Sequence, residues 1–454
     1  MSKSIGTFQK SIINKRKCIE ALCFVLLFSF LFFSGTAVCA VSPEWTGGVA
    51  IGFSGGTGTK DDPYLISTGE ELAYLSQQVN NGTSYTGQYF KLTQDILLNR
   101  LNADGTFVSQ PDQRKEFTSI GSVNEPFNGN FNGNGYEIIG LYINKNWVDY
   151  QGLFGYAGTG SVIQDLKVSG SIAGRDMTGS IAGYTNGLIT GCSSDCAITI
   201  KWAQYHGGIA GYAEANSVIS NCTVCGTVEG KEYVGGAVGY TEGKIIDCTG
   251  DNVVSGYQRV GGMAGYAAGI RSEISNCTFF GTILGTGSYY LGGIAGQIDG
   301  IIADCTISAT LTSSNGYVGG VAGYASGVDS RIVDCIVSGT VTAGGNGYAG
   351  GVAGQTDGEI TGCTVNVEVS APNSYIGGVA GYSKGADSII SDCTVSGTVT
   401  GTAGEGYVGG VAGQTDGTIT KCTCDCTVSG VHHYVGGVVG YAGTGSEVSN
   451  SSSA

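Results

Sequence analysis

A short glycine-rich phrase, close to G-G-[VI]-A-G-[YQ], recurs through the chain after Tyr150 and constrains the fold more than any other feature. Self-similarity at a regular interval is typical of repeat architectures, in which each unit buries its apolar side against the next. From the fifth copy onward the interval alternates between 27 and 31 or 32 residues, so the underlying unit is a pair of repeats of about 58 residues. The last glycine of the phrase marks eleven copies, at Gly155, Gly183, Gly211, Gly239, Gly265, Gly296, Gly323, Gly354, Gly381, Gly413 and Gly440.

Each repeat is predicted to contain three short strands. The first is the glycine phrase itself, as in residues 407–413, the second is I-x-[ND]-C-T-V, as in residues 390–395, and the third is T-V-T, as in residues 398–400. β-Branched residues dominate these segments, and Gly, Asn and Asp separate them. Strands this short cannot bury a face alone, but coils stacked about 4.8 Å apart can, which predicts an all-β solenoid on the order of 50 Å long.

The phrase G-G-V-A-G-Y followed by I-x-x-C-T-V-S-G-T-V resembles the GLUG repeat family of exported bacterial and archaeal surface proteins. The resemblance covers residues 150–454, which we expect to form one continuous solenoid with the last coil incomplete. It implies a β-solenoid and a role in adhesion or at the cell surface, and it supplies no catalytic residues. The same repeat also accompanies some immunoglobulin-A-cleaving metallopeptidases.

Residues 41–149 lack the phrase and are predicted to form an N-terminal cap followed by the first, irregular coils. The sequence S-T-G-E at residues 67–70 has the spacing of a capping box, and Leu72, Leu75 and Val79 follow at helical intervals. A short amphipathic helix here would cover the open end of the solenoid, because a terminal coil must hide its apolar interior and its unpaired strand edges. The region resembles the entry segment of right-handed parallel β-helix proteins.

The first forty residues indicate export. A basic stretch, an apolar run over residues 21–33 and a small-residue segment ending at Ala40 are the layout of a cleaved secretory signal peptide, with an uncleaved membrane anchor as the alternative. The net charge of −15 argues against nucleic acid or anionic lipid as a partner. We therefore expect an extracellular protein that is secreted or held at the cell surface.

A cysteine recurs once in most repeats, nine to twelve residues after the phrase glycine. The equivalent position is Leu166 in the first repeat and Ser451 in the last, so the side chain is predicted to face an apolar interior as a buried free thiol. A disulfide or metal array is the alternative, although neighbours about 4.8 Å apart exceed the separation that a disulfide prefers. This cysteine ladder comprises Cys192, Cys222, Cys248, Cys277, Cys305, Cys335, Cys363, Cys393 and Cys422.

Two further cysteines follow the last member of the ladder. Alternation along a strand places Cys422, Cys424 and Cys426 on one face, which would allow a bond to a cysteine of another coil or a thiolate metal site. However, Cys424 occupies the position of Val365, which is predicted core, and no complete four-ligand zinc pattern is present.

Two columns of tyrosine are in register with the repeats, and an exposed column would offer a stacking surface for a glycan or a partner protein. Stacking between coils within the molecule is the alternative, and the sequence does not decide which column faces out. The first column, with predicted ligand-facing side chains, comprises Tyr205, Tyr233, Tyr290, Tyr317, Tyr348, Tyr375, Tyr407 and Tyr434. The second column comprises Tyr156, Tyr184, Tyr212, Tyr240, Tyr266, Tyr324, Tyr382 and Tyr441.

Sites for catalysis or for a cofactor are not predicted. Asp299, Asp357 and Asp416 each precede a glycine at the same corner and would at most bind calcium weakly, since Asp-Gly is above all a turn sequence. The sequence contains three histidines and no H-E-x-x-H or P-loop motif. Arginines are scattered rather than repeated at one corner, unlike in parallel β-helix enzymes that cleave polysaccharides.

The sequence therefore predicts a non-catalytic surface or secreted repeat protein for adhesion or ligand display, with a glycan or a surface protein as partner. The alternatives are a structural envelope component that self-associates and a polysaccharide-acting β-helix enzyme. After Tyr441 the sequence is polar and lacks the third strand, so we also expect end-to-end association through the C-terminal edge.

Overall fold

The computed structural model describes residues 41–287, 289–372, 375–431 and 434–453. The signal peptide predicted for residues 1–40 lies outside these residues. Within the described ranges, no helix is both long enough and apolar enough to cross a membrane.

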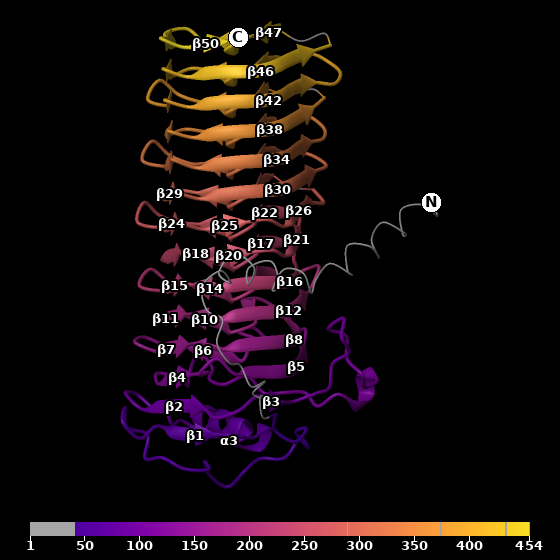
Figure 1. The fold of residues 1–454 in the computed structure, drawn as a ribbon, viewed down its shortest axis with the longest axis vertical. Coiled ribbons are helices and arrows are strands. Elements are labelled where there is room, and N and C mark those ends of the chain that lie inside the picture. The colour runs from indigo at the N-terminus through magenta and orange to yellow at the C-terminus, as the bar shows by residue number, and fades with distance from the viewer. Residues whose placement is uncertain (1–40, 288, 373–374, 432–433, 454) are drawn as a thin grey trace, which may run out of the picture.

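The described chain is a stack of coils whose strands form four parallel sheets (Figure 1). In chain order around one coil, sheet I has 14 strands, sheet II has 15, sheet III has 10 and sheet IV has 11. Sheet I runs from β1 (Tyr64–Ile66) to β49 (Glu447–Ser449), and sheet II from β3 (Ile96–Leu97) to β50 (Ser452–Ser453). Sheet III runs from β9 (Thr178–Gly179) to β47 (Tyr434–Gly436), and sheet IV from β6 (Phe154–Ala157) to β48 (Val439–Ala442). The predicted all-β parallel solenoid is confirmed, and sheets I and II continue from the N-terminal region into the repeats.

One coil shows how the repeat folds, and it corrects the predicted division into strands. It consists of β41 (Ile389–Ser391), β42 (Thr394–Gly401), β43 (Tyr407–Gly409) and β44 (Ala412–Thr415), one strand in each sheet. The prediction of three strands per repeat is wrong at two points. The predicted second strand is divided between β41 and β42, with its last residues joined to T-V-T in the single strand β42, and the glycine phrase is divided between β43 and β44.

Both corners have a backbone cause. Asp392, between β41 and β42, has a φ of 52°, in the left-handed region that Asn and Asp tolerate better than other non-glycine residues. The corner between β43 and β44 lies at Gly410, where an added Cβ would be 2.0 Å from the carbonyl oxygen of Gly437 in the next coil. Only glycine permits this approach, so the phrase is fixed by the stacking distance as well as by strand formation.

The core consists of columns of identical or similar side chains. Residues one coil apart pair in register, so Val337 lies beside Val365 and Val365 beside Val395, and all three are buried. The isoleucines of sheet I form an equivalent column, with Ile360 beside Ile390. Each coil thus supplies the apolar surface that covers its neighbour.

The N-terminal end is covered by the helix α3 (Gly69–Asn80), at the indigo end of Figure 1. Its side chains Leu72, Leu75 and Val79 are fully buried, as predicted. The capping box is formed by Thr68 and Glu71, one residue later than the predicted S-T-G-E at residues 67–70. The Thr68 hydroxyl accepts a hydrogen bond from the backbone N–H of Glu71, and the Glu71 carboxylate accepts one from the N–H of Thr68.

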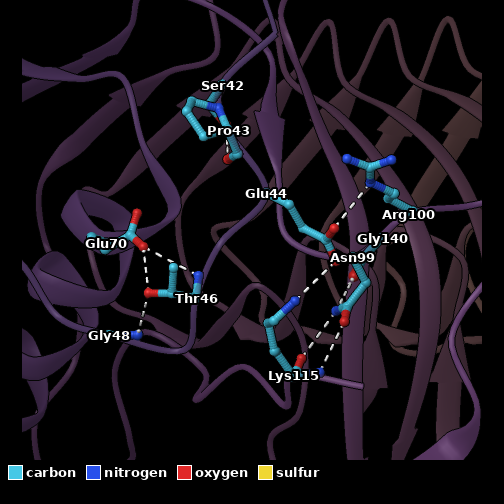
Figure 2. A network of polar contacts seen from close by, with 10 residues as sticks. All are labelled: Ser42, Pro43, Glu44, Thr46, Gly48, Glu70, Asn99, Arg100, Lys115 and Gly140. Carbon is cyan, nitrogen blue, oxygen red and sulfur yellow. Dashed lines mark hydrogen bonds and ion pairs between the residues drawn. The ribbon is translucent and has the colours of Figure 1, made fainter. Parts of the chain in front are cut away.

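A polar network ties the first described residues to this cap (Figure 2). Glu44 pairs with Arg100 at 3.0 Å and with Lys115 at 2.9 Å, and the hydrogen bond from Lys115 holds the pKa of Glu44 below its usual range. The Thr46 hydroxyl donates to Glu70 on α3 at 2.8 Å. The segment before the helix is therefore fastened both to the helix and to the loop that carries Lys115.

At the other end of the stack, side chains of the last coil are exposed. Tyr434 is 69% exposed, Val435 48% and Val448 43%. The end-to-end association inferred from the sequence, like the domain boundaries, stays a prediction.

Candidate functional site

Both tyrosine columns lie on the same outer surface of the solenoid. A first-column residue such as Tyr375 begins its strand of sheet III, β39 (Tyr375–Gly377), and a second-column residue such as Tyr382 lies in the next strand, β40 (Ala380–Ser383) of sheet IV. The corner between β39 and β40 joins the two columns into one surface. We call the sixteen tyrosines of both columns the tyrosine face.

Where tyrosines occupy neighbouring coils of a column, most of their rings stack on each other. In the first column, Tyr205 and Tyr233 have ring centroids 4.7 Å apart and an interplanar angle of 1°, and Tyr348 and Tyr375 are 4.9 Å apart at 12°. In the second column, Tyr212 and Tyr240 are 4.8 Å apart at 16°. These centroid distances correspond to the separation of neighbouring coils.

Contacts also run between the columns. Tyr375 and Tyr382 meet edge to face with centroids 5.8 Å apart, and Tyr407 and Tyr441 are 4.8 Å apart. Apart from the buried Tyr184 and the exposed Tyr434 and Tyr441, the rings of the face are half-buried. Stacking between coils and exposure to solvent, which the sequence presents as alternatives, therefore occur together.

From the coil of Gly296 onward, the second column alternates between tyrosine and glutamine, and the glutamines are tied to the Asp-Gly corners. Asp357 accepts hydrogen bonds from the amide of Gln355 in its own coil, at 2.9 Å, and from the hydroxyl of Tyr324 in the preceding coil. The same Tyr–Asp–Gln triad recurs two coils away on either side; its members are Tyr266, Asp299 and Gln297, and Tyr382, Asp416 and Gln414.

The triads account for the pairing of repeats. They also engage the carboxylates of Asp299, Asp357 and Asp416, the residues predicted to bind calcium at most weakly. Burial, together with the hydrogen bond to the carboxylate, raises the pKa of Tyr266, Tyr324 and Tyr382. Each carboxylate uses one oxygen for a phenol and the other for an amide. Weak calcium binding at these corners stays a prediction, and any cation would have to displace these hydrogen bonds.

Arg259 replaces tyrosine in the first column and is its one cationic member in the described coils. Its guanidinium lies 5.0 Å from the ring centroid of Tyr233 and 5.5 Å from that of Tyr290, within cation–π range. Its Nε donates to the Gln297 side chain at 2.8 Å. The arginine thus bridges the gap that the missing ring would leave.

The cysteine ladder lies inside the solenoid. All nine members are buried and unbonded, and each thiol lies near a backbone carbonyl, as with Cys335 and Val333 at 3.4 Å. A hydrogen bond with the thiol of the preceding coil, followed by burial, raises the pKa of Cys335, Cys363 and Cys393. Such thiols are poor nucleophiles and poor metal ligands at neutral pH.

The two additional cysteines are bonded to each other. Cys424 and Cys426 form a disulfide within β46 (Thr423–Gly430), rather than either cysteine bonding to another coil. Cys424 is buried, in register with Val395, as predicted from its core position. In the described part of the chain, no group of three or more His, Cys, Asp or Glu side chains is arranged to hold a metal ion.

The glutamines of the triads and Arg259 were not assigned a role from the sequence. The available signal was the tyrosine-to-glutamine change in the glycine phrase, which coincides with an Asp-Gly two residues later at Gln297, Gln355 and Gln414. Two positions that change together in alternate repeats indicate a contact between neighbouring coils.

Comparison with known proteins agrees with the repeat pattern. The model of the GLUG motif matches four stretches of the chain, residues 203–229, 256–284, 372–400 and 432–454. The chain therefore contains GLUG repeats. Each matched stretch contains the glycine phrase and passes through all four sheets, so one motif corresponds to about one coil, and the intervening coils repeat the same sheet pattern.

The similar proteins match this chain over part of their length. The chain is 34% identical over 147 residues to a protein of Evansella cellulosilytica described as a Gly-rich membrane protein, a match covering 31% of this chain and 15% of that protein. It is 32% identical over 135 residues to halomucin of Haloquadratum walsbyi, covering 30% of this chain and 1% of halomucin. A solved structure from Bacteroides ovatus, described as an immunoglobulin A1 protease, aligns at a TM-score of 0.40 and 20% identity, covering 70% of this chain and 80% of that one.

Proposed function

We propose that this GLUG-repeat protein is an exported, non-catalytic surface protein that binds a ligand through its tyrosine face. The observation that carries the proposal is the extent of this face, in which half-exposed rings of two columns lie side by side and recur at every coil or every second coil. The second column, with its phenols oriented by carboxylates, adds a wide aromatic surface that offers both apolar area and hydroxyl groups.

The dimensions of the face suit an extended ligand or a multivalent one. Equivalent rings recur at every coil or every second coil, so a long polymer or a cell surface could engage several of them at once. Several weak contacts acting together give an avidity that no single contact supplies. This is the behaviour expected of an adhesion protein.

The arrangement of the charged groups supports a non-catalytic role. Arg175 is paired with Asp149 at 2.6 Å and Arg331 with Glu359 at 2.9 Å, on different coils, while Arg259 lies in the tyrosine face. These arginines do not converge on one groove with a pair of carboxylates. One relative is described as a membrane protein, which supports a location at the cell surface.

Binding of the mature chain to a glycan array, and to whole cells, tests the proposal. The double variant Tyr348→Ser/Tyr375→Ser removes two adjacent rings that stack 4.9 Å apart, and we expect it to weaken binding at least tenfold. Ile336→Ser, which removes a 53% exposed apolar side chain from sheet II, is the matched control and should bind normally. Cell binding that survives periodate treatment but not proteolysis would assign a protein ligand. Equal binding by the double variant and the unaltered chain would refute the proposal.

A further inference from the structure

A groove outside the tyrosine face runs across successive coils at the corner between sheets II and III. Its lining residues lie at or just after the ends of the strands β12 (Ser193–Thr199), β16 (Thr223–Glu229) and β21 (Val253–Gly256). The groove has a volume of about 640 Å³. Two aromatic side chains line it, Trp202 and Tyr257, together with lysine and glutamate side chains. Its volume lies within the range of small-molecule sites in proteins.

The aromatic side chains of the groove are more exposed than most rings of the tyrosine face, which are half-buried. Trp202 is 84% exposed and Tyr257 is 44% exposed. Trp202 precedes β13 (Gln204–Gly207) and Tyr257 precedes β22 (Gln258–Gly261), and β17 (Glu232–Gly235) pairs with both, so the two residues lie two coils, or about 10 Å, apart. Two exposed aromatic side chains along one groove offer a ligand both apolar faces and polar edges.

The polar lining of the groove is balanced in charge. Lys201 and Glu229 approach to 3.6 Å, and Lys231 and Glu232 to 3.8 Å, so the four side chains carry no net charge while offering both hydrogen-bond donors and acceptors. The chain as a whole carries a net charge of −15, which repels polyanions. The groove therefore favours an uncharged ligand rich in hydroxyl groups.

The floor of the groove is backbone held in place by the coils. Gly256 has no side chain, and an added Cβ would lie 2.9 Å from methyl groups of Val234 and Val260. The carbonyl oxygen of Lys231 accepts hydrogen bonds from the N–H groups of Tyr257 and Gln258, both at 2.9 Å. A ligand would meet a site whose backbone is already ordered, which reduces the entropic cost of binding.

We propose that this groove binds an uncharged oligosaccharide, with the apolar faces of two sugar rings on Trp202 and Tyr257 and the hydroxyl groups on the lysine and glutamate side chains. Sugar rings combine an apolar face with a rim of hydroxyls, which is the combination that the lining presents. The inference goes beyond the proposed function, because the groove residues lie outside the tyrosine face and would bind ligand even if that face did not.

Titration calorimetry with a panel of hexasaccharides tests the proposal. The panel consists of cellohexaose, chitohexaose, laminarihexaose and mannohexaose, with a hyaluronan hexasaccharide as the anionic comparison. We expect at least one neutral member to bind the mature chain, and Trp202→Ala and Tyr257→Ala each to weaken that binding at least tenfold. Trp147→Ala is the matched control, because Trp147 is 86% exposed and lies outside this groove.

The outcomes distinguish the groove proposal from the proposal for the tyrosine face. Because the substituted side chains are exposed, the variants should unfold at the temperature of the unaltered chain, which shows that a loss of binding is local. Absence of binding by every neutral hexasaccharide, equal binding of the hyaluronan fragment, or undiminished binding by Trp202→Ala would each overturn the groove proposal. Tyr348→Ser/Tyr375→Ser should leave hexasaccharide binding intact, so a failure of the tyrosine face would be distinguished from a failure of the groove.

Discussion

The irregular N-terminal coils and the regular repeats solve the same packing problem in different ways. In the N-terminal coils the interior is filled by large rings in unique positions, with Phe127 4.9 Å from Phe154 and 5.9 Å from Phe90 between ring centroids. In the repeats the interior is filled by small side chains in columns, such as Val337 and Val365. A large ring at the N-terminal end contacts several elements at once, whereas a repeat side chain contacts its copies above and below.

This difference predicts in which region a substitution destabilises the molecule most. In a repeat array, stability is approximately a sum of local terms between neighbouring units, so a defect stays local and equivalent defects cost similar amounts. The N-terminal coils have no equivalent copies, and their aromatic cluster joins the cap to the first regular coil. A substitution there should affect more of the structure than the same change in the middle of the array.

The largest expected effect is from Phe127→Ala. Phe127 is fully buried between Phe90 and Phe154, and removing its ring should lower the free energy of unfolding by about 3–5 kcal/mol. Val365→Ala, in the middle of the array, should cost about 2 kcal/mol because fewer methyl groups are lost. Urea denaturation followed by circular dichroism measures both values, and equal losses would remove the distinction between the two regions.

The cysteine ladder tests whether equivalent positions are energetically equivalent. Cys335→Ala and Cys393→Ala should each lower the free energy of unfolding by about 1–2 kcal/mol, and by similar amounts, because the two thiols occupy the same place in different coils. Thiol labelling adds a second readout. The ladder cysteines should react only after denaturation, and prompt reaction in the native protein would show that the columns are open to solvent.

A pH effect is expected from His206, a buried histidine in β13. Its neighbours in register in the adjacent strands are Thr178 and Val234. Its Nδ1 lies 3.0 Å from the carbonyl oxygen of Glu229, and its Nε2 lies 3.0 Å from the carbonyl oxygen of Arg175. Those carbonyls favour the protonated ring, and so does the nearby Asp176, but burial opposes protonation more strongly and lowers the pKa of His206.

Because the folded pKa lies below the unfolded one, the unfolded chain binds the proton first as the pH falls. Stability should therefore be greatest above about pH 6.5 and decline below it, with a slope of at most about 1.4 kcal/mol per pH unit for a single proton. His206→Val restores the side chain of the next coil and should remove this slope. Urea midpoints of both proteins at pH 7.5 and pH 5.5 measure this pH dependence of stability. If the variant loses as much stability between the two pH values as the unaltered chain, other groups cause the effect.

The smallest expected effect is at a triad of the tyrosine face. Burial, together with the hydrogen bond to Asp357, raises the pKa of Tyr324, and Asp357→Asn removes the second of these causes. The pKa of Tyr324 should therefore fall toward its ordinary value, while stability changes by less than about 1 kcal/mol. Absorbance of the tyrosinate band during alkaline titration provides the measurement. Asp329→Asn, at an exposed loop position, should leave the titration unchanged, and an equal shift in both variants would show that the triad has no specific influence.

The solenoid could be predicted from the sequence because the glycine phrase and the cysteine recur together at a regular interval. The capping helix could be predicted because its apolar residues have helical spacing. The strand boundaries were wrong because the corners depend on left-handed backbone at residues such as Asp392, which composition does not reveal. The exposure of the tyrosine columns could not be predicted either. Tyr375 and Tyr382 are seven residues apart and would face opposite sides of one strand, but Val379 and Ala380 are both buried at the corner, which interrupts the alternation.

The Tyr–Asp–Gln triads also bear on how such a chain can change its length over evolutionary time. Each triad joins a tyrosine of one coil to an Asp and a Gln of the next, so loss of a single coil would bring two coils of the same kind together and leave a carboxylate without its phenol. Loss or duplication of two coils preserves every contact. Unequal recombination between repeats should thus be tolerated in steps of about 58 residues, and the gene would lengthen and shorten by whole pairs.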